Sequence, residues 1–152
     1  MQDLAAQKAL CPTSQLENKR MSENTNEENS AQSIGKRLVA LCQEGKGMEA
    51  VELLYDEKIV SIEAESTEAL PARMEGMEAV QGKNAWWYDN HEIHDSSAAG
   101  PFCGYRDDQF AAHFEMDVTF KPTGERSKLV EMALYTVANG KIVQEEFWYQ
   151  VD

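Results

Sequence analysis

SKLVEMALYTVANGKIVQEEFWYQV, residues 127–151, is the most informative stretch of the chain, because it predicts two β-strands joined by a tight turn. Asn139-Gly140 accepts the positive φ angles that both central positions of a type I′ turn require, and β-branched and apolar residues flank the pair. A hairpin that carries this many apolar and aromatic side chains needs a covering layer. The only helix-like segments lie upstream, so the sequence predicts an α+β fold.

The net charge and the number and spacing of the cysteines limit the classes of binding partner and site that we expect. The chain has 152 residues, the size of one domain, and its formal net charge is -13. Such a charge opposes binding to nucleic acid or to an anionic membrane surface, so we expect neither as a partner and expect small molecules or proteins instead. The three cysteines form no Cys-x-x-Cys pair, and no apolar run has the length of a membrane span. We expect reduced thiols, no metal, no organic cofactor and a cytoplasmic location.

The N-terminal segment is polar, and residues 22–29 contain no apolar side chain. Such a segment cannot bury enough surface to offset the entropy lost on ordering it. We therefore expect residues 1–30 to form a flexible polar tail or a loosely attached helix, and residues 31–152 to form the folded domain. Met21 is an alternative start site to Met1.

Three segments show the apolar spacing of amphipathic helices, namely residues 31–44, 48–55 and 76–91. Residues 59–64 are β-branched and predict a short strand, and a loop follows to Arg73.

Further along the chain, residues 92–99 predict a strand that Gly100-Pro101 breaks. Residues 109–120 alternate apolar with polar side chains and predict a strand buried on one face. With the terminal hairpin, that strand completes an antiparallel meander.

The order of these elements resembles the SnoaL-like branch of the nuclear transport factor 2 superfamily. The resemblance extends from about Ala31 to the C-terminus. The residues that carry it are Leu53–Asp56 leading into Ile59–Glu63, then Glu75–Val80, then Leu134–Val143. The resemblance implies three N-terminal helices packed on a strongly curved, mainly antiparallel sheet. The sheet forms a cone whose open end is a pocket, and it commonly builds a homodimer.

Candidate catalytic residues follow from the same resemblance, which implies a general base at Glu63, at the end of the first strand. Burial in an apolar strand raises the pKa of a carboxyl and suits it to take a proton, whereas a rim carboxylate, solvated or paired with Lys or Arg, is the alternative. Glu131 is a second candidate carboxyl, or a solvated or interface residue. Tyr135 is a candidate oxyanion donor, or a packed side chain. The remaining catalytic positions of the isomerase-like members fall at Leu38 and near Ala133, so their set is not reproduced.

Candidate ligand-binding residues are Trp86, Trp87, His113 and Trp148. The tryptophans offer an apolar wall for a flat ligand, and core packing accounts for them equally well. His113 lies on the polar face of its strand, where a surface position, a dimer interface and a proton carrier are the alternatives. The sequence thus predicts a site for a small apolar or aromatic metabolite, with isomerase, cyclase or dehydratase chemistry. A non-catalytic ligand-binding or dimeric interaction domain is the alternative.

Overall fold

A computed structural model describes residues 13–151 as helices packed on one six-stranded sheet. In chain order the elements are α1 (Thr13–Glu28), α2 (Ala31–Gln43), α3 (Gly47–Leu54), β1 (Tyr55–Ile62), β2 (Arg73–Glu75), α4 (Met77–Asn90), β3 (His91–Phe102), β4 (Gln109–Phe120), β5 (Glu125–Ala138) and β6 (Lys141–Trp148). The strands lie in the order β2-β1-β6-β5-β4-β3, where β1 and β6 run parallel and every other neighbouring pair is antiparallel. The predicted α+β class is confirmed.

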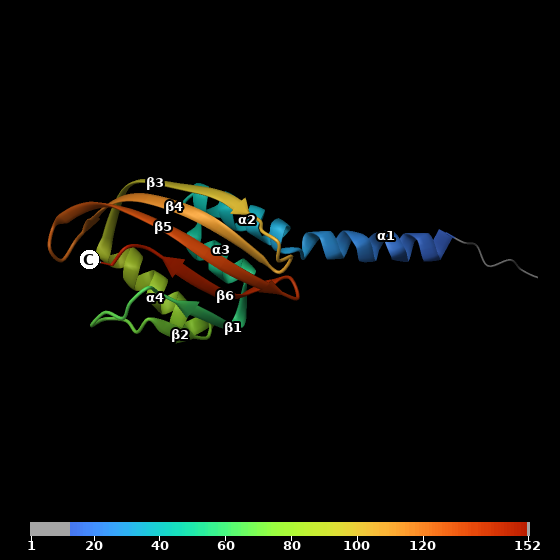
Figure 1. The fold of residues 1–152 in the computed structure, drawn as a ribbon, viewed down its shortest axis with the longest axis horizontal. Helices are drawn as coiled ribbons and strands as arrows, with labels where there is room; N and C mark the ends of the chain where they lie inside the picture. Colours follow the sequence, from blue (N-terminus) through green and yellow to red (C-terminus); the bar gives the residue numbers. More distant parts are fainter. Residues whose placement is uncertain (1–12, 152) are drawn as a thin grey trace, which may run out of the picture.

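The helices α2, α3 and α4 cover one face of the curved sheet (Figure 1). α2 begins after Ser30, whose hydroxyl accepts a hydrogen bond from the Ser33 N–H and caps the helix. Its buried face carries Ile34 and Leu38, which join Phe110 of β4 in one core. Burying a side chain of this size stabilises the fold by about 1.5 to 3 kcal/mol, so apolar contact holds the helices on this face.

The predicted hairpin is present. Asn139 and Gly140 join β5 to β6 with φ angles of 51° and 72°. The other strongly alternating segment, residues 109–120, forms β4 over the predicted bounds. The strands with the clearest pattern are therefore the ones whose bounds the sequence predicts best.

The upstream strands differ from the prediction. β1 begins at Tyr55, directly after α3, and not at Ile59. β2 follows the predicted loop and pairs with β1, a pairing that no sequence pattern indicated. β3 continues through Gly100 to Phe102, where the sequence predicted a break. A register shift between Ala99 and Phe102 accommodates Gly100, whose φ is 129°, so this glycine makes a bulge instead of ending the strand.

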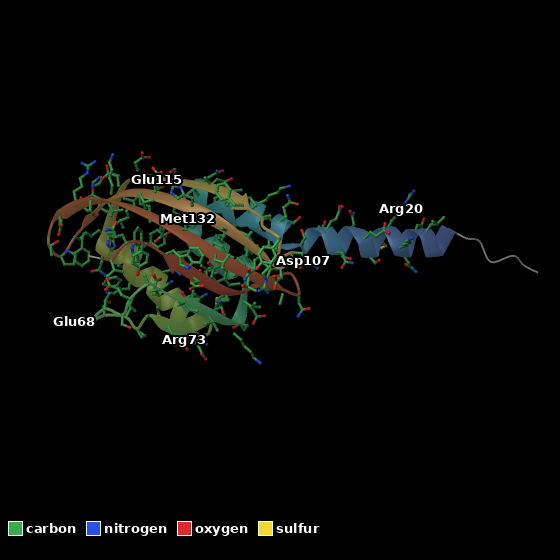
Figure 2. All side chains as sticks on the ribbon, viewed as in Figure 1. Arg20, Glu68, Arg73, Asp107, Glu115 and Met132 are labelled. Atoms are coloured by element: carbon green, nitrogen blue, oxygen red, sulfur yellow. The ribbon has the colours of Figure 1, made fainter. Side chains whose placement is uncertain are left out.

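α1 extends away from the body of the molecule, and Figure 2 shows the Arg20 side chain on it, clear of the sheet. Its side chains Leu16 and Met21 are exposed, which fits the predicted lack of surface to bury. None of the described helices is long and apolar enough to cross a membrane. Residues 1–12 lie outside the described residues, so the division into a tail at 1–30 and a domain at 31–152 stays a prediction.

The two faces of the sheet carry different side chains. Ala112, Ala133 and Ile142 point toward the helices and are fully buried, and we call this side the inner face. Figure 2 labels Glu115 on β4 and Met132 on β5, midway along the sheet. Both belong to the opposite, outer face, because successive residues of a strand point to opposite sides. This assignment places every candidate residue of the sheet on one face or the other.

Candidate functional site

A cluster of buried polar side chains lies on the inner face, between β1, β6 and α4. Ser61 and Glu145 occupy paired positions on the parallel strands β1 and β6. Lys83 reaches them from α4. Among the described residues these three are the buried polar or charged ones, with Glu145 only 1% and Lys83 only 8% exposed. Burying charged groups is costly unless they are paired and hydrogen-bonded, so the contacts within the cluster decide what it does.

Glu145 accepts hydrogen bonds at both carboxylate oxygens. The Ser61 hydroxyl donates to its Oε1 at 2.7 Å, and Lys83 Nζ donates to the same oxygen at 3.1 Å. The Tyr55 hydroxyl donates to Oε2. Three donors converge on this carboxyl, which is the arrangement that suits its ionised form.

Lys83 is surrounded by acceptors. Its Nζ donates to Ser61 Oγ at 2.8 Å, to Glu63 Oε1 at 2.7 Å and to Glu145 Oε1 at 3.1 Å. It also lies 4.5 Å from the centre of the Phe147 ring. Burial alone lowers the pKa of Lys83, but the negative charges of Glu145 and Glu63 outweigh that effect and raise the pKa above its ordinary value. The amine is therefore held as an ammonium ion.

Glu63 lies just beyond the end of β1, at the edge of the cluster, and its side chain is 21% exposed. Its Oε1 is held by Lys83, and its Oε2 accepts a hydrogen bond from the Tyr149 hydroxyl at 3.2 Å. Burial and the charge of Glu63 raise the pKa of Tyr149 to about 12, so this hydroxyl remains a donor. Both oxygens of the predicted base are thus engaged by the protein itself.

Glu131 lies on the inner face of β5, paired with Phe114 of β4. Its carboxyl makes no hydrogen bond within residues 13–151. Burial and the charges of Glu63 and Glu145 raise the pKa of Glu131 to about 7, although Lys83 acts in the opposite direction. This group exchanges its proton near neutral pH, which is the property that a general acid or base needs.

Tyr135, the third predicted catalytic residue, is packed in the core. It pairs with Glu145 across β5 and β6, and its ring stacks on Phe110 with centroids 4.8 Å apart. Burial, together with the charge of Glu145, raises the pKa of Tyr135 well above its ordinary value. The structure therefore places this phenol in the packed core, beside the buried carboxyl of Glu145.

The predicted ligand-binding residues separate into two groups. Trp87 stacks on His91 with ring centroids 4.5 Å apart, and Trp86 lies against Phe120, so both belong to an aromatic group at the end of α4. His113 and Trp148 lie on the outer face.

The outer-face pair lines a shallow depression of about 480 Å³, together with Val130, Met132 and neighbouring residues. Trp148 is 55% exposed there. Glu131 and Tyr149 also line this depression, so it adjoins the buried cluster.

Sequence reasoning missed Lys83 and Glu145 as site residues, although Lys83 carries a signal. Lys83 follows Val80 by three residues and precedes Trp87 by four, so it falls on the apolar stripe of its helix. The turn gives no such signal for Glu145, because a hairpin registered on its turn alone pairs Tyr135 with Gln144. A register shift between Thr136 and Val137 places Glu145 opposite Tyr135 instead. A charged residue that falls on an apolar face is the pattern that identifies Lys83.

Metal ligation is not indicated by the described residues, since nowhere between residues 13 and 151 do three His, Cys, Asp or Glu side chains converge. The expectation that the protein uses no metal or organic cofactor stays a prediction.

Comparison with known proteins identifies a family. Residues 29–149 match the model of the SnoaL-like domain. A solved structure from Mesorhizobium loti, described as a candidate SnoaL-like polyketide cyclase (carbohydrate phosphatase), is 43% identical with a TM-score of 0.70, covering 76% of this chain and 96% of that chain. No curated protein matches the chain.

More distant structures share the fold alone. A candidate isomerase from Bacillus subtilis is 19% identical with a TM-score of 0.62, covering 76% of this chain and 82% of that chain. A candidate polyketide cyclase from Pseudomonas putida is 14% identical with a TM-score of 0.59, covering 80% of this chain and 92% of that chain.

Proposed function

This chain belongs to the SnoaL-like family, and on that premise we propose that it is a proton-transfer enzyme that acts on a small apolar or aromatic molecule. The chemistry is isomerisation, cyclisation or dehydration, in which a proton leaves a carbon atom next to a carbonyl group. One observation carries the proposal. Glu131 is a half-buried carboxyl with no protein hydrogen bond among the described residues, and its pKa is raised to about 7.

Glu131 takes the role of general acid and base. A carboxyl with a pKa near the working pH is ionised often enough to accept a proton and is basic enough to hold it, and such catalysis contributes about 10² to 10⁴-fold in rate. Glu63, the base that the family resemblance implies, is less suited to that step because Lys83 and Tyr149 already occupy its two oxygens. Its negative charge keeps Glu131 basic, and its fixed side chain borders the substrate at the edge of the cluster.

The substrate lies against Glu131 and the apolar side chains beside it. Phe114 pairs with Glu131 across the sheet, and Phe147 packs on the same core. Aromatic side chains of this kind suit a flat, apolar ligand and exclude water from the carboxyl. After Glu131 has taken the proton it becomes a neutral acid, which returns the proton to another atom of the substrate.

Proton abstraction is tested with nitrobenzisoxazole, a flat aromatic probe. A carboxylate removes the proton from its ring carbon, the C–H electron pair completes a nitrile, and the N–O bond breaks to release a coloured phenolate. The wild-type protein accelerates this reaction. Glu131→Gln removes most of the acceleration, at least about 10²-fold. Glu63→Gln retains part of it, because the base is still present.

Glu115→Gln is the matched control, because it removes an exposed carboxylate of the outer face whose side chain is 62% exposed. It leaves the rate at the wild-type value. Equal rates in wild type and Glu131→Gln contradict the proposal.

We also propose that the protein is a cytoplasmic homodimer formed through the outer face. Val130 and Trp148 are each 55% exposed there, and an antiparallel sheet face that meets only water is normally polar. The same apolar side chains on a second copy complete a two-fold interface. Light scattering is expected to give the mass of a dimer for the wild type. The double variant Val130→Glu, Trp148→Glu is expected to give the mass of a monomer.

A further inference from the structure

We propose that Lys83 and Glu145 are positioning residues of the proton-transfer site: they fix Glu63 and set the charge that Glu131 faces, without touching the substrate. This inference rests on the proposed function and goes beyond it, because it assigns a role to an ion pair that the reaction itself does not use. Four features of the cluster support it.

The first feature is that the protein itself accepts the hydrogen bonds that Lys83 and the hydroxyls of the cluster donate. An ammonium group has three protons, and Lys83 Nζ has three protein acceptors, namely Ser61, Glu63 and Glu145. The hydroxyls of Ser61 and Tyr55 donate to Glu145, and that of Tyr149 donates to Glu63. Apart from the proton that Lys83 shares with Ser61, every one of these hydrogen bonds goes to one of the two carboxylates. Lys83 has no proton left for a ligand.

The second feature is burial. Glu145 is 1% exposed and Lys83 is 8% exposed, whereas the side chain of Glu63 is 21% exposed at the edge of the cluster. A substrate that reaches Glu131 thus meets Glu63 before it meets the ion pair. Lys83 and Glu145 act only through the groups that they hold.

The third feature is the net charge. The cluster contains two acidic side chains, Glu63 and Glu145, and one basic side chain, Lys83, so its formal charge is one excess negative charge. The groups that act on Glu131 are Glu63 at the end of β1, Lys83 on α4 and Glu145 on β6. Glu131 in turn acts on the phenols of Tyr135 and Tyr149, which stay neutral near pH 7. Removing either member of the ion pair therefore changes the charge facing Glu131 by one unit, in opposite directions.

The fourth feature is energetic. A buried ion pair contributes little to stability when it is compared with well-packed apolar side chains, because both charges lose their hydration. The fold alone does not require Lys83 and Glu145. A requirement for a fixed charge beside the reacting group accounts for both.

The experiment is a titration of the Glu131 side-chain carboxyl by carbon NMR in three variants. Glu145→Gln keeps the shape and removes one negative charge, so the midpoint moves down by about half a unit. Lys83→Met removes the positive charge, so the midpoint moves up. The double variant restores the net charge, so the midpoint returns close to the wild-type value. Glu115→Gln, on the outer face, leaves the midpoint in place.

Turnover of nitrobenzisoxazole distinguishes the effect of the net charge facing Glu131 from the effect of the position of Glu63. In the double variant Glu63 has lost its ammonium anchor, so the rate stays at least about threefold below the wild type although the titration is restored. The double variant also removes the buried unpaired charge, which keeps the test available if Lys83→Met alone does not fold. A rate that returns together with the midpoint overturns the positioning role.

The two proposals fail in different ways. A midpoint that does not move in Glu145→Gln, while Glu131→Gln still abolishes turnover, overturns this inference alone. Midpoints that move as stated, while Glu131→Gln retains turnover, overturn the proposed function and leave the electrostatic link intact.

Discussion

Ser61 and Glu145 face each other across the parallel strands β1 and β6, and the Ser61 hydroxyl donates to the Glu145 carboxylate at 2.7 Å. The same hydroxyl oxygen accepts a hydrogen bond from Lys83 Nζ at 2.8 Å. One small side chain thus bridges the two charged members of the buried pair. This bridge depends on the only parallel contact among the described strands, so the sheet topology itself assembles the site.

Replacing Ser61 with Ala removes this bridge. Glu145 then loses a donor and Lys83 loses an acceptor in a region that water does not reach, so we expect a loss of about 1 to 3 kcal/mol in the free energy of unfolding. Urea denaturation measures it. Ser97→Ala, which changes an exposed serine of β3, is the control and stays within about 0.5 kcal/mol of the wild type. Equal losses in the two variants contradict the role of the bridge.

Stability depends on pH through Glu131. Its pKa is raised from 4.5 to about 7 in the folded protein, so between these values the folded state keeps a proton that the unfolded chain has released. The contribution of this group is therefore fully present below about pH 4.5 and is lost as the pH rises through about 7, by up to about 3 kcal/mol.

Denaturant unfolding at about pH 5 and about pH 8 tests this dependence. Glu131→Gln, which does not titrate, loses that part of the pH dependence. If the free energy of unfolding of Glu131→Gln falls between the two pH values as much as that of the wild type, another group causes the dependence.

Gly140 tests the turn of the hairpin. Its φ is 72°, and a Cβ added there meets the side chain of Asn29. Gly140→Ala therefore combines backbone strain of about 1 to 2 kcal/mol with a clash. Gly124→Ala is a matched control, because its φ is also 72° but nothing lies within 4 Å of the added carbon. Thermal unfolding is expected to show the larger loss for Gly140→Ala, and equal losses would exclude the contact with Asn29.

Gly35 allows α2 to approach the sheet. A Cβ at this position lies 2.7 Å from Pro101 Cβ and 2.9 Å from the Phe110 ring, both of which are rigid. Gly35→Ala therefore destabilises the fold by about 1 to 3 kcal/mol through overpacking. Gly82→Ala, in α4, has open space and gains up to about 1 kcal/mol, because alanine favours the helix. Calorimetry that gives both variants the same sign contradicts this packing.

The sequence predicts the fold well where local chemistry and pattern agree. Asn139-Gly140 specifies its turn through positive φ, and residues 109–120 alternate over their whole length, so both features follow from neighbours in the chain. β1 begins four residues before the strand that the sequence predicts, because Tyr55 follows α3 without a turn signal. The sequence predicts a strand end at Gly100, although a glycine in a strand also fits a bulge.

The site was less accessible to prediction than the fold. Glu63 and Glu131 were identified by resemblance and by their position among apolar residues, and the structure brings the two together. Lys83 and Glu145 become neighbours only through the pairing of β1 with β6 and the packing of α4, which are long-range contacts. Lys83 donates a hydrogen bond to Glu63, whereas Glu131 receives none from the described residues. No local pattern carries that information.

The pH dependence of nitrobenzisoxazole turnover tests the central claim most directly, because the base must be ionised to accept the proton. The account predicts a wild-type rate that rises with pH, reaches half of its plateau near the Glu131 pKa of about 7, and loses this step in Glu131→Gln. A wild-type rate without a step in this range, or the same step in Glu131→Gln, would contradict it.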